Sequence, residues 1–194
     1  GADALIVADV GVIALAKQYA PRVPLHISTQ TSILNHAAAN FWADLGAERI
    51  VLARELRLEE IAEIRAKTPK ELEIEAFVHG ALCVCYSGDC QAGFATTGRS
   101  ANRGECPQIC RHRFDLTDNQ GNKIIEGKHL LSLRDLNRSV LLEPMLEAGV
   151  TSFKIEGRLK DAGYVKNIVA YYCQCLDTII DAHPDRYCRS SLGH

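Results

Sequence analysis

The chain has 194 residues, of which 47% are apolar and 24% are charged, and its formal net charge is -2. These values are typical of a globular protein with one domain and a sizeable core. The small net charge excludes a general attraction to nucleic acid, so RNA binding would need a local basic patch. No apolar run reaches the roughly 18 residues of a membrane span, and no secretion leader precedes the first strand, so we expect a cytoplasmic protein.

The first 78 residues alternate between short apolar strands and amphipathic helices. Strands are predicted at 4–7, 25–28, 49–53 and 72–78, and helices at 10–19, 35–45 and 58–67. Pro21 and Gly46 follow the first two helices and end them. Because the strands start at intervals of roughly 21 to 25 residues, the size of a β-α unit, we predict parallel strands with the helices packed outside.

A loop rich in cysteine and glycine follows the fourth strand, over residues 79–113. Four of its five cysteines are Cys83, Cys90, Cys106 and Cys110, and Cys85 is the fifth. The glycines spread through this loop argue against one long helix. A loop of this length inside a compact domain is usually functional or disordered, and the cysteines favour a functional one.

The pattern changes after Arg113. Two short strands at 114–117 and 123–125, around a turn at 118–122, predict a β-hairpin. A short strand or extended segment follows at 130–133. The remaining predicted elements are a helix at 140–148, a strand at 151–155 and a helix at 161–181, and the tail after Pro184 gives no pattern.

The alternation predicts an α/β fold, a partial (β/α) barrel of the TIM type with a cysteine-rich insertion. A closed barrel needs about 250 residues, and the chain provides only five such units, or six if the segment at 130–133 is counted. The chain starts directly on a strand, so we expect the first units of the barrel to be missing from it. We therefore predict one incomplete barrel domain over residues 1–194, with a cysteine-rich and hairpin insertion at 83–127.

The cysteine loop leaves its strand at the carboxyl end, which is the face of a parallel barrel where functional groups gather. Outside an oxidising compartment, clustered cysteines favour metal or redox chemistry over disulfides. Four thiolates at irregular spacing suit a cubane iron–sulfur cluster, whereas structural zinc more often uses tighter spacings, and free thiols are the third alternative. We expect Cys85 to point elsewhere than Cys83, so it is left out of the ligand set. We interpret Cys173 and Cys175 as core residues or as chance occurrences, and Cys188 gives no signal.

Polar side chains lie at or just after several predicted strands. They are His26, Gln30, Arg54, Glu55, His79, Lys154, Glu156 and Arg158. On the carboxyl face of a barrel such groups converge around its mouth. Guanidinium groups bind carboxylates bidentately, so Arg54 and Arg158 could clamp a small dicarboxylate. In the alternative interpretation these side chains only form ion pairs that fasten loops.

A basic run lies within and just after the cysteine loop. It contains Arg99, Arg103, Arg111, His112 and Arg113. These side chains would supply phosphate contacts to RNA despite the acidic overall balance. Aromatic residues for base stacking are few, and a solvated basic loop is the alternative.

The sequence around the cysteines resembles a known family. The segment EAFVHGALCVCYSGDC, residues 75–90, is similar to the signature of the bacterial U32 family, long labelled collagenase-like peptidases. The segment TGRSANRGECPQICR, residues 97–111, is similar to the branch that hydroxylates a cytidine of 23S ribosomal RNA. Further matches lie at 25–30, 50–56, 128–132 and 152–158, so the resemblance covers nearly the whole chain to about residue 182.

The resemblance implies an enzyme that hydroxylates RNA without oxygen, depends on prephenate and carries a [4Fe-4S] cluster. Carried over by motif, the cluster ligands are Cys83, Cys90, Cys106 and Cys110. With ribosomal RNA as the partner, the residues expected to hold its phosphates are Arg99, Arg103, Arg111 and Arg113. The residues expected to hold the acidic co-substrate are Arg54, His79, Lys154 and Arg158. Cys85 stands where a small residue such as alanine is expected.

Two other functions stay open. The family label suggests a peptidase, although the sequence has neither an H-E-x-x-H zinc motif nor a G-x-S-x-G elbow. A non-catalytic iron–sulfur scaffold, of the kind that this family contributes to ubiquinone synthesis, is the third function. Spectra recorded without oxygen separate the peptidase from the other two, and mass spectrometry of RNA separates the hydroxylase from the scaffold.

Overall fold

A computed structural model describes residues 1–189 of the chain as an α/β protein. The predicted domain at 1–194 therefore includes five residues, 190–194, that lie outside the described residues. In the described part, no helix has both the length and the apolar character needed to cross a bilayer.

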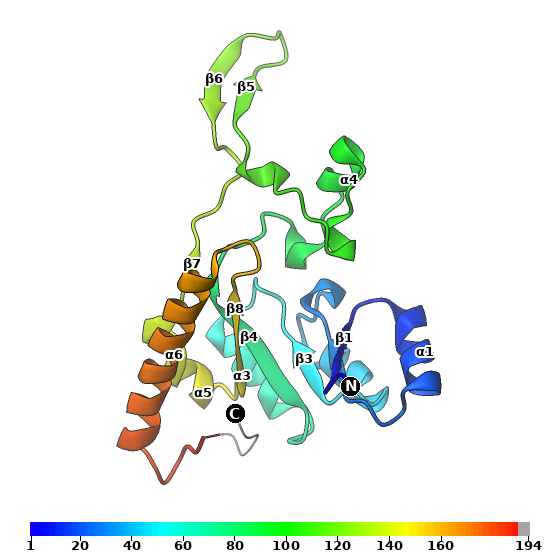
Figure 1. Cartoon of the computed structure of the whole chain (residues 1–194), viewed down its shortest axis with the longest axis vertical. Coiled ribbons are helices and arrows are strands. Elements are labelled where there is room, and N and C mark those ends of the chain that lie inside the picture. The colour runs from blue at the N-terminus through cyan, green and yellow to red at the C-terminus, as the bar shows by residue number, and fades with distance from the viewer. Residues whose placement is uncertain (190–194) are drawn as a thin grey trace.

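The sheet contains the predicted succession of parallel strands. Strands β1 (Leu5–Val7), β2 (Leu25–Ile27), β3 (Arg49–Val51) and β4 (Glu73–Gly80) lie side by side in chain order. Strand β8 (Ser152–Glu156) is parallel to β4 and pairs with its other edge. The prediction of parallel β-α units is confirmed, but within residues 1–189 the sheet is open and no barrel closes (Figure 1).

The helices follow the strands much as predicted. They are α1 (Val10–Tyr19), α2 (His36–Asp44), α3 (Leu58–Ala66), α4 (Ala92–Thr97), α5 (Leu142–Glu147) and α6 (Ala162–Ala182). Side-chain carboxylate or amide oxygens of Asp9, Asn35 and Asp161 accept a backbone N–H in the first turn of α1, α2 and α6, at 2.8–2.9 Å. Such caps satisfy donors that a helix leaves free, so these boundaries are set by local sequence.

The two faces of the sheet differ in polarity. On the face covered by helices, Ile27, Ile50 and Ile74 have 0% exposure and form the centre of the hydrophobic core. Side chains alternate along a strand, so the neighbours Arg49 and Glu75 point to the opposite face. This second face therefore carries charged groups close to the core.

Of the two alternatives predicted for residues 130–133, a short strand or an extended segment, the strand is wrong. The chain instead forms β7 (Leu136–Asn137), which pairs antiparallel with Gly80 and His79 at the end of β4. Residues 130–133 form a turn and an irregular segment, and Leu131 is 45% exposed. An apolar run has strand propensity, but here no neighbouring strand edge pairs with it.

The segment between β4 and β7 contains the predicted insertion. Its hairpin, β5 (Phe114–Thr117) and β6 (Lys123–Lys128), is confirmed and projects away from the sheet (Figure 1). The Asp118 side chain closes the hairpin turn by accepting the backbone N–H groups of Gln120 and Asn122. The short 3-10 helices of the chain are η1 (Thr29–Thr31), η2 (Tyr86–Gly88), η3 (Ala101–Arg103), η4 (Ile109–Arg111) and η5 (Ser139–Leu141).

Candidate functional site

A cavity of about 710 Å³ lies between the carboxyl ends of the strands and the cysteine loop. The lining residues that come from the strand ends and the segments after them include Gln30, Arg54, Phe77, Lys154, Glu156 and Arg158. The five cysteines of the insertion, Cys83, Cys85, Cys90, Cys106 and Cys110, line the same cavity. Strand ends and thiols thus meet in one place, as the pattern predicts for a parallel sheet.

The pKa values of several thiols that line this cavity depend on neighbouring thiols. All eight cysteines of the chain are free. Burial, followed by a hydrogen bond with the Cys90 thiol, raises the pKa of Cys85 to about 12. Burial works against ionisation of Cys90 too, but backbone N–H groups of Gly93 and Ala92 and the Cys85 thiol lower its pKa. Of this pair, Cys90 therefore ionises first.

The donor set fits an iron–sulfur cluster in number and chemistry. Within residues 1–189, no three His, Cys, Asp or Glu side chains already have the geometry of a metal site. The four predicted ligands nevertheless line one cavity, and Cys110 is close enough to Cys83 and Cys106 for their charges to affect its pKa, which burial raises. Cys85 lines the cavity beside them, so the prediction that it points elsewhere than Cys83 is wrong. Side chains two residues apart in an extended segment point to the same side, and Cys85 itself has an extended backbone conformation.

Arg54 is the cation best placed to receive an anion in the cavity. Its guanidinium stacks 4.2 Å from the centroid of the Phe77 ring, and its Nη2 atom is 3.8 Å from Glu156 Oε2. Its Nε atom is buried and has no hydrogen-bond partner among the described residues. A buried, unpaired N–H beside a loosely held Nη2 leaves one edge of the guanidinium available for a carboxylate.

Lys154 and Arg158 have different surroundings. The Lys154 ammonium is 3.1 Å from Glu75 Oε1 and 5.5 Å from the Phe77 ring centroid. Its charge is thus already matched by a carboxylate. Arg158 is exposed and lines the cavity from the loop after β8. The structure places both side chains at the cavity, and leaves Arg158 the freer of the two.

Glu75 is the centre of the charged sheet face. Its Oε2 atom accepts from Ser152 at 3.0 Å and from Arg49 at 3.3 Å, while Oε1 contacts Lys154. Burial alone would raise the pKa of Glu75, but the Lys154 ammonium, the hydrogen bonds and Arg49 together hold it below its ordinary value. This carboxylate therefore stays ionised and fixes the position of Lys154.

His79 does not line the cavity. A β-bulge in the pairing of β4 with β8 lies between Phe77 and His79, so the residues on either side of Val78 no longer share a face. The His79 ring turns to α6, where Nδ1 is 3.2 Å from the Tyr172 hydroxyl and Nε2 is 3.0 Å from the Tyr164 hydroxyl. Tyr172 donates its own proton to the Val78 carbonyl, so His79 Nδ1 donates and Nε2 accepts.

This arrangement makes stability depend on the protonation of His79. Burial lowers its pKa from the ordinary 6.5, with Asp135 opposing the shift. Because the unfolded chain binds this proton more tightly, stability from neutral His79 is complete above pH 6.5 and is lost as pH falls through the lowered pKa. We expect His79→Gln to reduce the loss of unfolding free energy between pH 7.5 and 5.5 in urea titrations. His112→Gln, at an exposed histidine, is the control, and an unchanged pH dependence in His79→Gln would contradict the assignment.

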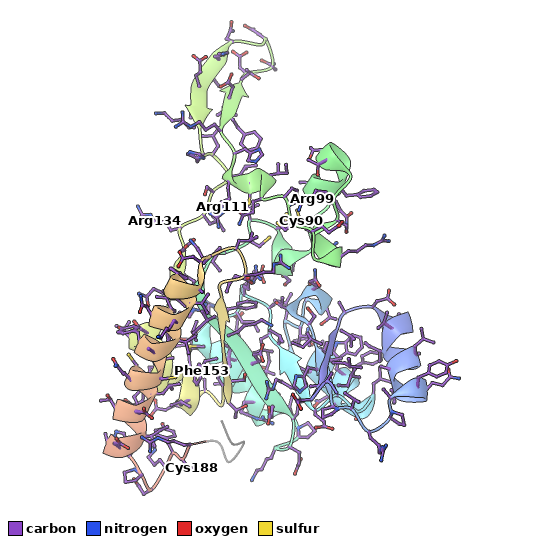
Figure 2. The ribbon with its side chains drawn as sticks, in the orientation of Figure 1. Cys90, Arg99, Arg111, Arg134, Phe153 and Cys188 are labelled. Carbon is purple, nitrogen blue, oxygen red and sulfur yellow. The ribbon has the colours of Figure 1, made fainter. Side chains whose placement is uncertain are left out.

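The four arginines predicted to bind RNA separate into two groups. Arg99, Arg103 and Arg113 are exposed. Arg111 is not free, because its guanidinium donates to Leu82 O at 2.9 Å, to Leu133 O at 2.5 Å and to Ser132 Oγ at 2.7 Å. Figure 2 shows Arg111 at the base of the hairpin and Arg99 near Cys90. Arg111 therefore has a structural role, contrary to the predicted phosphate contact.

Sequence reasoning missed two residues of the site. Phe77 stacks against Arg54. The sequence signal for it is an aromatic residue two positions after Glu75, and therefore on the same charged face of the strand. Asn102 accepts the backbone N–H of Cys90 at 3.2 Å and donates to Asp89 at 2.8 Å. Nothing local in the sequence indicates this contact. Of the other strand-end residues, His26 and Glu55 lie outside the cavity lining.

The chain is similar to known proteins whose names refer to RNA hydroxylation in some cases and to a protease in another. A 23S rRNA 5-hydroxycytidine C2501 synthase from Escherichia coli is 50% identical over 193 residues, covering 100% of this chain and 29% of that protein. The tRNA hydroxylation protein P1 of Bacillus subtilis is 38% identical, covering 94% of this chain and 44% of that protein. An uncharacterized protease, MJ0090 of Methanocaldococcus jannaschii, is 41% identical, covering 92% of this chain and 45% of that protein.

The chain thus spans less than half the length of these relatives. The family model for peptidase family U32 matches residues 1–192, which is nearly all of the chain. The residues matched include the whole cavity and every cysteine of the insertion. The chain belongs to peptidase family U32.

Proposed function

We propose that this chain carries the thiol site of an RNA-modifying enzyme that hydroxylates a cytidine of 23S ribosomal RNA, without oxygen and with prephenate as co-substrate. The observation that carries the proposal is one cavity lined by five thiols and by cationic side chains from the strand ends. The name of the Escherichia coli relative, at 50% identity over the whole chain, supports the choice of reaction. The chain covers 29% of that relative, so the activity of the whole relative comes to this chain only as a proposal.

Four thiols would hold the cofactor. In the proposal Cys83, Cys90, Cys106 and Cys110 ligate one [4Fe-4S] cluster, which supplies redox or Lewis-acid chemistry when bound. The lowered pKa of Cys90 favours the thiolate that a ligand must provide. Cys85 lines the same cavity but lies outside the ligand set that the family resemblance implies.

The acidic co-substrate would bind beside the thiols. Arg54 offers the edge formed by Nε and Nη2, and its stacking on Phe77 fixes the plane of the guanidinium. A carboxylate that reaches this edge replaces the long contact to Glu156 with a bidentate one. Arg158 can add a second contact from the rim, while Lys154 keeps its pairing with Glu75. His79 has no part in this site, because α6 holds its ring.

RNA would approach from the side of the insertion. Arg99, Arg103 and Arg113 are exposed there and can contact phosphates, which bind basic side chains without regard to sequence. They lie within or just after the cysteine loop in the sequence, and the hairpin projects from the same insertion (Figure 1). This local positive charge is what an RNA site on a chain of net charge -2 requires.

In the full-length protein the open sheet would form part of a (β/α) barrel. Its outer face is apolar and covered by helices, whereas its inner face carries Arg49, Glu75 and Lys154 in one charge network. Parallel sheets are normally covered on both faces, so a charged second face suits the interior wall near a barrel mouth. The closed barrel remains part of the proposal.

The test is made on ribosomal RNA in the host of this protein. Deleting the gene should remove one hydroxycytidine from 23S RNA in mass spectra, and the wild-type gene should restore it. The modification should persist in cells grown without oxygen and should vanish in cells that cannot make prephenate. In the deletion strain, hydroxylated uridine in tRNA serves as the control and should not change.

Persistence of the hydroxycytidine in the deletion strain would rule out the proposal. The relative named as a protease makes a second outcome specific. If the purified full-length protein cleaves gelatin and the ribosomal RNA stays modified without the gene, the peptidase function is the correct one. Loss of ubiquinone synthesis with unchanged RNA would point to the scaffold.

A further inference from the structure

The cysteine loop contains a residue in a disfavoured backbone conformation. Ser87, within η2 and between Cys85 and Cys90, has φ 47° and ψ 20°, and its exposure is 0%. Residues with a Cβ atom rarely adopt this left-handed region, and they persist there only when surrounding contacts determine the conformation. The structure must therefore contain a group that holds Ser87.

That group is the carboxylate of Glu55. The Ser87 backbone N–H donates to Glu55 Oε1 at 2.7 Å, and the Ser87 hydroxyl donates to Glu55 Oε2 at 3.0 Å. Both hydrogen-bond donors of a buried residue are thus satisfied by one side chain from the segment after β3, 32 residues earlier in the chain. Hydrogen bonds to a charged acceptor are stronger than those to a neutral one, so this contact can hold a strained turn.

We propose that Glu55 is a positioning residue for the thiols of the cysteine loop. It holds the Tyr86–Gly88 turn, and this turn determines how Cys85 and Cys90 face Cys83 across the cavity. The carboxylate does not line the cavity, so it acts through Ser87 and not on a substrate. Only the consequence for iron binding rests on the proposed function, because the placement of the thiols exists without a metal.

The variant Glu55→Gln tests the bidentate contact directly. A glutamine side chain has one acceptor oxygen, and its NH₂ group faces a donor, so one of the two Ser87 donors loses its partner. In the full-length, metal-free protein we expect iodoacetamide to alkylate Cys85 and Cys90 about tenfold faster than in wild type. Glu59→Gln, an exposed neighbour with the same loss of charge, should leave both rates unchanged. The rate at Cys175, on α6, reports any global unfolding.

A second substitution separates positioning from a change in local charge. Ser87→Gly removes the strain and the hydroxyl donor, and leaves a single N–H that the glutamine oxygen can accept. The double variant Glu55→Gln with Ser87→Gly should therefore return the alkylation rates to within about threefold of wild type. A charge effect of Glu55 on thiol ionisation would persist in the double variant and overturn the proposal. If Glu55→Gln unfolds the whole protein, the alkylation rates of the double variant decide whether the loss of the Ser87 contact is the cause.

Iron binding distinguishes this proposal from the proposed function. If wild type takes up iron without oxygen, Glu55→Gln should take up less and the double variant should regain it. If wild type takes up no iron but the alkylation rates change as expected, the cluster is wrong and the positioning role stands. Equal alkylation rates in wild type and Glu55→Gln overturn the positioning role, whatever the iron content.

Discussion

Replacing Cys106 by alanine is expected to abolish cluster binding. Reconstituted without oxygen, the wild-type protein should hold about four iron atoms per chain and absorb broadly near about 400 nm, from thiolate-to-iron charge transfer. A cluster with three remaining thiols loses a ligand at one iron, so Cys106→Ala should hold less than about one iron atom per chain. In the deletion strain this variant should also fail to restore the hydroxycytidine.

Three cysteines outside the proposed ligand set provide matched controls. Cys173 and Cys188 are exposed, and alanine at either position should leave the iron content unchanged. Cys85→Ala is the sharper comparison, because Cys85 lines the same cavity but lies outside the proposed ligand set. Retention of iron in Cys85→Ala and loss in Cys106→Ala confirm the ligand set. Equal iron in Cys106→Ala and wild type contradicts it.

Gly80→Ala is expected to be strongly destabilising, because this glycine ends strand β4 of the sheet. Gly80 has φ 104°, and an added Cβ atom would lie directly against the backbone carbonyl oxygen of Glu156 on β8. Strand pairing holds both backbones, so neither can move away without breaking the sheet. We expect the unfolding free energy to fall by about 3 to 5 kcal/mol, measured by urea titration, because steric overlap adds to the backbone penalty.

Gly121→Ala separates the two contributions. Gly121, in the hairpin turn, has φ 86°, but a Cβ atom there meets nothing within 4 Å. Its substitution should cost about 1 to 2 kcal/mol, the backbone penalty alone. If Gly80→Ala and Gly121→Ala cost the same, the close approach of β4 to Glu156 is not the reason for the glycine.

The sheet and its helices could be predicted because their signals are local. The Asn35 cap of α2, the continuous apolar run that starts at Ile50 and the alternation around Ile74 need no knowledge of the partner strand. The same holds for the hairpin, whose turn is closed by Asp118. The meeting of strand ends with the cysteine loop then follows from the rule that parallel strands end at the same edge.

What could not be predicted depends on contacts between distant segments. His79 leaves the cavity because of a bulge in the pairing with β8, and a strand pattern shows neither bulge nor partner. Arg111 looks like a phosphate ligand in a basic run, but two backbone carbonyls and a hydroxyl from other segments occupy its guanidinium. The Leu136–Asn137 strand is too short to give any periodic signal.

Arg111 also determines how freely the insertion can vary. One guanidinium bonds to Leu82, where the chain leaves β4, and to Ser132 and Leu133, where it returns. The two ends of the insertion are therefore held close together by Arg111, which belongs to the insertion itself. The entropic cost of lengthening such a tied loop grows only slowly with its length. We therefore expect that residues can be added or removed at the hairpin tip without moving the sheet.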